Sequence, residues 1–396
     1  MVSGKVHRKI LVTAVASATL LGACASSSPS GDGDDPIRIG AVSSITGPAP
    51  FPEVPGAAQA VFDSVNAEGG IDGRMIEFIS RDDGGDPGKA NQQARSLADE
   101  QEVVAFVGGA SLVDCNTNGG VYEDKDVISL MGAGVEPECF TSTHIAPVNN
   151  GTVQGYANLL YFASEHLDRT RVCPIILKSP GLTEPYLELI EQWEADTGST
   201  AALVDTSINL GDDPTPVMLA IEKAECDAVV FNSNEPTAVA FMDAAKRQGV
   251  LESADWLTLA AAYTDSVLDT LASQDTLGLY VNSEFVPLND DSQALETWRD
   301  TLEDADVQRT SLSMGGYVAA QVVVDVLHSI DGEITRESLT EAITNLDSLD
   351  HPLVGNDLSF AEWPDSPLNR SSRMLQATQD GWEPVGEWID ADQDVG

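Results

Sequence analysis

The most regular feature of the chain is an alternation between short apolar runs and longer stretches that are apolar on one face only. Residues 36–43 form a nearly continuous apolar run, which predicts a buried strand, and the apolar residues between 56 and 67 recur at helical spacing. Gly69 and Gly70 end that helix, because glycine tolerates the left-handed conformation of a helix cap. In the rest of the first half the pattern predicts strands at 75–80, 103–107 and 127–131, and a helix from 87 to about 100.

The same alternation returns in the second half of the chain. It predicts strands at 172–177, 201–208, 228–232 and 256–260, and helices at 185–197, 216–224 and 237–248. Because parallel strands need crossover connections, usually helices, this order favours parallel sheets with right-handed crossovers. We therefore expect an α/β fold of two similar lobes, each built on a doubly wound parallel sheet.

The first residues follow a different pattern. Three basic residues precede an apolar run at 10–21, and small residues follow it, which is the order found in export signals. The run is too short to span a bilayer comfortably, since that takes roughly 20 apolar residues. Residues 21–23, Leu-Gly-Ala, directly before Cys24 resemble the lipobox of bacterial lipoproteins, which implies removal of residues 1–23 and a lipid on the Cys24 sulfur. An ordinary signal peptide with an incidental cysteine is the alternative.

Composition limits the partners of the part that follows Cys24. The net charge is −44, with 20 Lys and Arg against 64 Asp and Glu, so the surface repels phosphate backbones and nucleic-acid binding is not expected. The same charge repels anionic lipid, which leaves the acyl chains as the membrane anchor. Residues 24–36 contain no core-forming run and predict a flexible tether. The acidic excess fits either a salty habitat, where salt screens self-repulsion, or a generally acidic exported protein.

Several segments carry a resemblance to a known family. They are 66–74 (NAEGGIDGR), 82–90 (DDGGDPGKA) and 103–108 (VVAFVG), with weaker matches at 315–320, 358–360 and 380–382. In this order they resemble the extracellular solute-binding proteins of the Leu/Ile/Val-binding type, which feed ABC importers. The glycines of the first segment end a helix and make a tight turn, so these motifs mark the fold rather than the ligand site.

The resemblance implies the type I periplasmic-binding-protein architecture. Two α/β lobes are joined by three hinge crossovers, and a ligand is held between the lobes at the carboxyl ends of the strands. The expected organisation is a signal peptide at 1–23, a tether at 24–36, a first lobe at 37–150 and 285–355, and a second lobe at 151–284 and 356–396.

The candidate pocket departs from the family pattern. In amino-acid-binding members, hydroxyl side chains of the first lobe and residues of the second lobe grip the ligand's ammonium and carboxylate groups. Here Val135 falls on a family threonine, Leu182 on a family tyrosine, and Ala261 on or near a family glutamate, whereas the family alanine is kept as Ala133. Because a buried charge without partners is very costly, the sequence argues against a standard branched-chain amino acid as the ligand.

Polar candidates remain on both expected walls of the cleft, and an aromatic side chain near the start of the first lobe could stack on or cover the ligand. The candidate ligand-binding residues are Phe51, Ser111, Cys115, Asn116, Ala133, Val135, Leu182, Thr183, Asn232, Asn234, Glu235 and Tyr263.

Four cysteines remain when Cys24 is set aside, and an even number of cysteines in an exported protein favours disulfides. Three pairings are possible. Cys115 and Cys139 lie at the mouths of two expected neighbouring strands of the first lobe, and Cys173 and Cys226 begin two expected strands of the second. We therefore expect the disulfides Cys115–Cys139 and Cys173–Cys226, with four free buried thiols as the alternative.

Other chemistry has no support in the sequence. Residues 85–89 lack the spacing of a phosphate-binding loop, and the acidic turn at 82–86 lacks the twelve-residue calcium loop with its closing glutamate. The histidines show no paired metal-binding spacing, and no G-x-S-x-G motif of a serine hydrolase occurs. We expect no catalytic residue, no metal and no cofactor, and hence no enzyme.

The expected function is that of a monomeric, extracytoplasmic, lipid-anchored substrate-binding protein. It would capture a small polar or amphipathic solute between its lobes and deliver it to the permease subunits of an ABC importer. Two alternatives remain open at this point: a ligand sensor of the same fold that signals through a membrane partner, and a hydrolase on an α/β scaffold. The sequence does not name the ligand.

Overall fold

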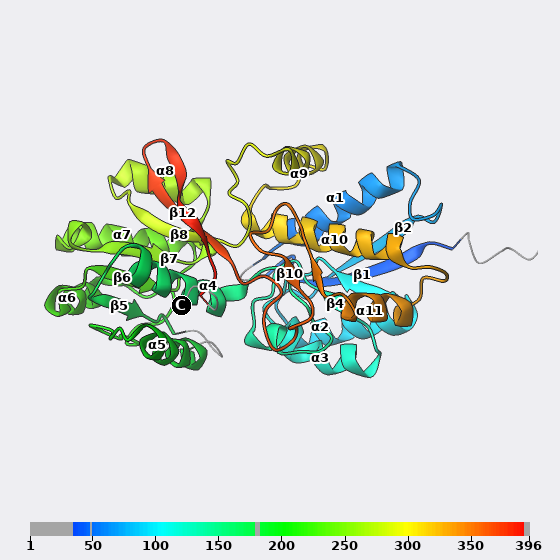
Figure 1. The fold of residues 1–396 in the computed structure, drawn as a ribbon, viewed down its shortest axis with the longest axis horizontal. Coiled ribbons are helices and arrows are strands. Elements are labelled where there is room, and N and C mark those ends of the chain that lie inside the picture. Colours follow the sequence, from blue (N-terminus) through cyan, green and yellow to red (C-terminus); the bar gives the residue numbers. More distant parts are fainter. Residues whose placement is uncertain (1–34, 48–49, 179–182, 392–396) are drawn as a thin grey trace, which may run out of the picture. The chain divides into compact units, whose positions relative to one another are not determined.

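The computed structural model describes residues 35–47, 50–178 and 183–391. Its longer strands form two sheets, and each sheet is the centre of one lobe (Figure 1). The sheet of the first lobe is entirely parallel and has the order β2-β1-β3-β4. Its strands are β1 (Ile37–Ser43), β2 (Ile76–Asp82), β3 (Ala105–Val107) and β4 (Ser129–Leu130).

The sheet of the second lobe has six strands in the order β12-β11-β8-β7-β6-β5. Its strands are β5 (Val172–Ile175), β6 (Ala228–Phe231), β7 (Asp255–Thr258), β8 (Leu279–Ser283), β11 (Ser372–Thr378) and β12 (Gly381–Ile389). β5 to β8 are parallel, whereas β11 runs antiparallel to both of its neighbours, β8 and β12. A tight turn joins β11 directly to β12, as an antiparallel pair allows. The expectation of two α/β lobes with parallel sheets is confirmed.

Helices connect most of the strands, and five of them, near 56–67, 87–100, 185–197, 216–224 and 237–248, lie where the pattern predicts. They are α1 (Glu53–Ala67), α2 (Pro87–Arg95), α3 (Asp114–Asp124), α4 (Gly151–Tyr161), α5 (Thr183–Thr197), α6 (Thr215–Ala224), α7 (Glu235–Gln248), α8 (Asp265–Gln274), α9 (Gln293–Asp304), α10 (Ser311–Ser329) and α11 (Arg336–Thr344). Within the described ranges, no helix is both long and apolar enough to cross a bilayer.

One predicted strand, at 201–208, does not form. The segment comes after α5 in the chain and lies beside β5. It makes only isolated bridges there, between Ile175 and Asp205 and between Lys178 and Asn209. The Asp205 side chain accepts a hydrogen bond of 2.7 Å from the backbone N–H of Ser207, and such a local turn competes with a regular strand ladder.

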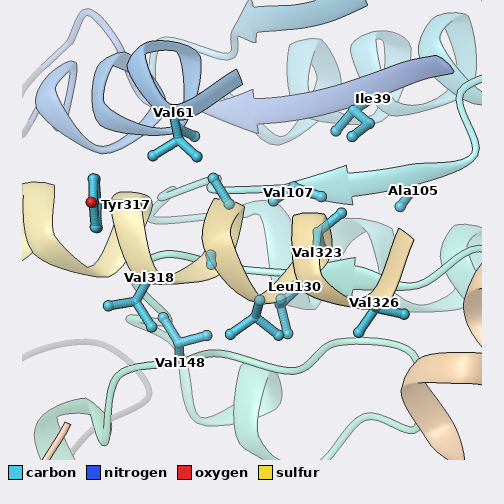
Figure 2. Packing of buried hydrophobic residues seen from close by; sticks show 14 of the residues in the cluster. Ile39, Val61, Ala105, Val107, Leu130, Val148, Tyr317, Val318, Val323 and Val326 are labelled. Carbon is cyan, nitrogen blue, oxygen red and sulfur yellow. The ribbon is translucent and has the colours of Figure 1, made fainter. Parts of the chain in front are cut away.

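The core of the first lobe lies where α1 and α10 pack against the parallel sheet. Figure 2 shows residues of this core, with Val61 on α1, Val318 and Val323 on α10, and Leu130 on the sheet. The two helices approach so closely because α10 has a glycine at the contact: a Cβ on Gly316 would lie 2.0 Å from the Val54 carbonyl oxygen. The glycine pair in the 315–320 motif therefore serves close helix packing.

Three stretches of chain cross between the lobes, at 149–151, 284–285 and 369–371. The expected division of the chain into two lobes stays a prediction, although residues on both sides of its boundary at 355/356 pack into one core. Leu358, Phe360 and Leu368 pack into the core of the first lobe, together with β1 and α10. The short pair of strands β9 (Ser348–Leu349) and β10 (Leu358–Ser359) folds this segment back onto the first lobe, so the chain crosses only after Leu368.

Both predicted disulfides are present. Cys115 and Cys139 have Cα atoms 5.1 Å apart, and Cys173 and Cys226 have Cα atoms 5.9 Å apart. β5 and β6 are neighbouring strands, as the pairing of Cys173 with Cys226 requires. The alternative of four free thiols is therefore wrong.

Candidate ligand-binding site

The carboxyl ends of β1, β3 and β4 lead into a small buried apolar cluster, which we call the apolar floor. Its buried members are Val54 in the first turn of α1, Ala110 after β3 and Ala133 after β4. The side chains of Phe51 and Leu312 are partly buried against it. Parallel α/β sheets bind ligands at this edge, so this cluster lies directly beneath the place where a ligand is expected.

The hydroxyl groups beside the apolar floor point into the protein. The Ser44 and Ser111 hydroxyls donate to the two carboxylate oxygens of Asp83, at 2.8 Å and 2.5 Å. The Ser111 oxygen also accepts the backbone N–H groups of Val113 and Asp114, both at 3.1 Å. Because Ser111 is fully buried and both its donor and acceptor capacities are used, it serves as an internal anchor of the loop after β3.

A second buried carboxyl, Asp114, lies at the start of α3. It accepts hydrogen bonds from Asn118 Nδ2 at 2.7 Å and from the Tyr122 hydroxyl at 2.9 Å. Burial raises the pKa of Asp114 to about 7, against the effect of these two donors, and the nearby Asp83 charge adds to the rise. The group therefore titrates between acidic and neutral pH in the folded protein.

This shift makes stability depend on pH in a defined direction. Unfolded aspartate releases its proton near pH 3.9, about three pH units below folded Asp114, so the folded state holds the extra proton in between. The free energy of unfolding therefore falls as pH rises from about 4 to 7, by up to about 4 kcal/mol from this group. We expect Asp114→Asn to gain stability relative to the wild type across this window, measured by denaturant unfolding at each pH. Parallel curves for the two chains would contradict the assignment.

The N-terminus of α3 is occupied by a carboxylate of the protein itself. Glu136 Oε2 accepts the backbone N–H groups of Cys115 at 2.9 Å and of Asn116 at 3.2 Å. Burial raises the pKa of Glu136, while these two hydrogen bonds oppose the rise. A helix N-terminus is a ready anion site, so Glu136 competes there with any ligand carboxylate. Asn116 itself is exposed, and its amide lies 3.4 Å from the Glu138 carboxylate.

The same region contains a group with metal-binding residue types, Cys115, Glu136 and Cys139. Both sulfur atoms are joined in the disulfide, so neither is the thiolate that binds a metal. The arrangement stabilises two adjoining loops and gives no reason to expect an ion.

Most polar candidates after β6 have structural partners. The Asn232 amide bonds both backbone groups of Leu177, at 2.7 Å and 3.0 Å. The Asn234 side chain caps α7 by accepting the N–H of Thr237 at 3.2 Å, although its side chain is exposed. These contacts explain why asparagine stands at both positions.

Tyr263 is engaged in a similar way. Its hydroxyl accepts the backbone N–H of Leu288 at 2.8 Å, and its ring packs edge-on against Trp382, with ring centres 5.6 Å apart. Thr183 is the first residue of α5, whereas Leu182 and the proposed lipid site Cys24 lie outside the described residues.

Two glutamates from different lobes lie close enough to influence each other. Glu53 is the first residue of α1 and Glu235 is the first residue of α7. Burial raises the pKa of Glu53, and the negative charge of Glu235 adds to the rise. The two carboxylates bring negative charge to the side of the candidate site that adjoins Phe51.

A family model of the periplasmic binding proteins matches residues 36–381. The chain belongs to the periplasmic binding protein family. Among its relatives, the leucine-, isoleucine-, valine-, threonine- and alanine-binding protein of Pseudomonas aeruginosa is 23% identical over 223 residues, which are 54% of this chain and 58% of that protein. The chain thus matches less than two thirds of the length of that relative.

Solved structures of this family share the fold. The fatty acid ABC transporter substrate-binding protein from Thermomonospora curvata superposes with a TM-score of 0.73 at 19% identity, covering 91% of this chain and 94% of its own. The branched-chain amino acid transporter substrate-binding protein of Streptococcus pneumoniae, in complex with isoleucine, superposes with a TM-score of 0.72 at 14% identity. The match covers 88% of this chain and 99% of that protein. At these identities the likeness shows the fold alone. The family consists of solute-binding proteins and not of enzymes.

In this member of the family, the sequence pattern did not reveal several residues of the apolar floor. Helix α1 begins at Glu53 rather than at 56, because Pro55 lies in the first turn, where its missing N–H is not needed. Val54 therefore enters the floor from the helix itself. Leu312 lies three residues before the glycine pair of α10. The motif that contains this glycine pair was therefore the sequence signal that could have located Leu312.

Two cavities adjoin the candidate site. One of about 220 Å³ lies between the loop after β4 and the starts of α4 and α5, and its lining includes Val135, Phe140 and Val153. Another of about 600 Å³ lies where α8, α9 and the β11–β12 turn meet, and its lining includes Glu235 and Tyr263. Val135 thus faces hydrocarbon, whereas Glu235 and Tyr263 share a more polar cavity.

Proposed function

We propose that this periplasmic binding protein is anchored outside the cytoplasm by a lipid on Cys24, captures a small solute between its lobes, and delivers it to an ABC permease. Family membership, the two α/β lobes and the three crossovers support capture by closure of the lobes. The export signal and the residues before Cys24 support the location and the anchor.

The observation that carries the ligand assignment is the apolar floor with its inward-facing hydroxyls. An α-amino acid brings a carboxylate and an ammonium group, and each needs buried partners. Ser111 is committed to Asp83, the N-terminus of α3 is occupied by Glu136, and Val135 offers hydrocarbon. The ligand is therefore a small, largely apolar solute that does not present the zwitterion of a branched-chain amino acid. The fatty acid transporter protein of Thermomonospora curvata is named for an apolar solute on the same fold.

The ligand contacts assigned to this site come from both lobes. Phe51, Ala133 and Val135 of the first lobe supply apolar contact. Glu235, at the start of α7 in the second lobe, supplies a negative charge. The full proposed set is Phe51, Ser111, Cys115, Asn116, Ala133, Val135, Leu182, Thr183, Asn234, Glu235 and Tyr263, with Ser111 and Cys115 shaping the wall through the backbone.

A substitution in the apolar floor tests this placement. Leu312→Ala removes apolar contact area, and a loss of about 1.4 kcal/mol corresponds to a tenfold weaker affinity. We expect roughly this loss in calorimetric titrations with a solute found by a thermal-shift screen of amides, short peptides, aromatic acids and amino acids. Leu219→Ala is the matched control, because Leu219 lies on α6 with 58% of its surface exposed. Equal affinities for both variants and the wild type would place the ligand elsewhere.

A further inference from the structure

The three stretches that cross between the lobes are tied to one another by side-chain hydrogen bonds. The Asn369 amide donates to the Glu284 backbone carbonyl at 2.7 Å, which joins the third crossover to the second. The Asn150 amide donates to the Ser371 carbonyl at 3.0 Å, which joins the first to the third. A rotation of one lobe against the other therefore acts on the three crossovers together and not on each of them separately.

The centre of the set is the carboxylate of Glu284. It is 5% exposed, and one of its oxygens accepts both the Asn149 amide at 3.1 Å and the Gly151 backbone N–H at 3.0 Å. Burial raises the pKa of Glu284, and these donors oppose the rise. Both donors are neutral N–H groups of the first crossover, so the place of this carboxylate in the interior depends on that crossover keeping its position.

Asn149 extends these contacts to the candidate site. Its side-chain oxygen accepts the Gly134 backbone N–H at 2.7 Å, and its side-chain nitrogen donates to the Gly134 carbonyl at 3.2 Å. Gly134 lies between Ala133 and Val135, two residues of the proposed ligand-contacting loop. A single amide side chain thus holds this loop and the Glu284 carboxylate at once.

Packing joins the same two places. A Cβ on Gly134 would lie 2.9 Å from the Phe140 ring, and a Cβ on Gly151 would lie 2.3 Å from it. Gly151 also has φ of +75°, a conformation that other residues rarely adopt. The Phe140 ring therefore fills the space between the loop after β4 and the start of α4 in the second lobe.

We propose that Asn149 and Glu284 are positioning residues that couple the loop after β4 to the angle between the two lobes. A shift of Gly134 moves the Asn149 amide, and the amide in turn carries a hydrogen bond on which the buried Glu284 carboxylate depends. The loop position and the lobe angle then change together. This coupling rests on the proposed function for its use in ligand capture.

The test measures the lobe angle in the full chain without any ligand. Nitroxide labels on Glu123→Cys in α3 and Glu188→Cys in α5, both exposed positions, report the distance between the lobes by pulsed electron paramagnetic resonance. Glu284→Gln removes the carboxylate charge that strengthens the hydrogen bonds from the Asn149 amide and the Gly151 N–H. We expect the distance distribution to become at least twice as wide as in the labelled chain with Glu284. An unchanged width in a folded Glu284→Gln chain would overturn the proposal.

Asp114→Asn is the matched control. It makes the same carboxyl-to-amide change at an equally buried site, but all of its partners lie within the first lobe. We expect it to leave the distance distribution unchanged, even though it alters stability. If the distance distribution of this control widened by the same amount, the effect of Glu284→Gln would be a general loss of rigidity. That result would overturn the proposal.

Asn149→Ala keeps the proposal testable if Glu284→Gln does not fold. It removes the link between Gly134 and Glu284 and leaves the carboxylate in place. We expect Asn149→Ala to widen the distance distribution as well. The distribution of the double variant should be no wider than that of the single variant with the larger effect, because both changes interrupt the same path. Broadening that adds up in the double variant, or none with Asn149→Ala, would overturn the coupling. Since no ligand is present, these outcomes are independent of whether the chain binds a solute.

Discussion

Removing the Cys173–Cys226 disulfide should lower the free energy of unfolding by about 4 kcal/mol. The bond joins residues 53 positions apart, and the stabilisation from closing a loop in the unfolded chain grows with loop length. We expect this loss in the double variant Cys173→Ala with Cys226→Ala, measured by denaturant unfolding. Alanine avoids placing new polar groups where the two sulfurs are buried.

The other disulfide is the internal comparison. Cys115 and Cys139 are 24 positions apart, which gives a loss of about 3.5 kcal/mol on the same scale. The two double variants should therefore rank in the order of their loop lengths. A loss below about 1 kcal/mol for the longer loop would show that the unfolded chain is already constrained there.

Replacing Gly316 by alanine should destabilise the first lobe by about 1–3 kcal/mol, the usual range for overpacking. The new Cβ would lie 2.0 Å from the Val54 carbonyl oxygen, a backbone atom that cannot rotate away. Helix α10 must then move from α1, and with it Leu312 of the apolar floor. Thermal and denaturant unfolding of the variant measure the loss.

Gly120→Ala is the control for this glycine. Gly120 also lies within a helix, α3, but a Cβ there meets nothing within 4 Å. Because alanine favours helix more than glycine does, this variant should be stabilised by about 0.5–1 kcal/mol. Equal losses in both variants would contradict the close-packing explanation for Gly316.

The sequence predicted the parts of the fold that depend on neighbouring residues. Helix ends at glycine pairs and the alternation of strands and helices follow from local pattern, whereas the pairing of Cys173 with Cys226 joins residues 53 positions apart on neighbouring strands. The third crossover did not, because whether 356–368 packs on the first or the second lobe depends on contacts made by Leu358, Phe360 and Leu368 with distant segments.

The candidate site was harder to predict for the same reason. The direction of the Ser111 hydroxyl is set by Asp83, which comes from the loop after another strand. The apolar floor joins Val54 to Leu312, which are far apart in the chain. From sequence alone, the valine in place of the family threonine at Val135 indicated the loss of a charge-gripping group, but not that Val54 and Leu312 pack together with the residues that follow β3 and β4.

The proposed ligand is a small, largely apolar solute and not an amino-acid zwitterion. Calorimetric titration of the chain with leucine, and with 4-methylpentanamide as the analogue that keeps its aliphatic chain but lacks both charges, tests this most directly. We predict that leucine gives no binding at millimolar concentration, and that the uncharged analogue binds at least about tenfold more tightly than leucine, a difference of about 1.4 kcal/mol. Micromolar binding of leucine would contradict the proposed ligand class.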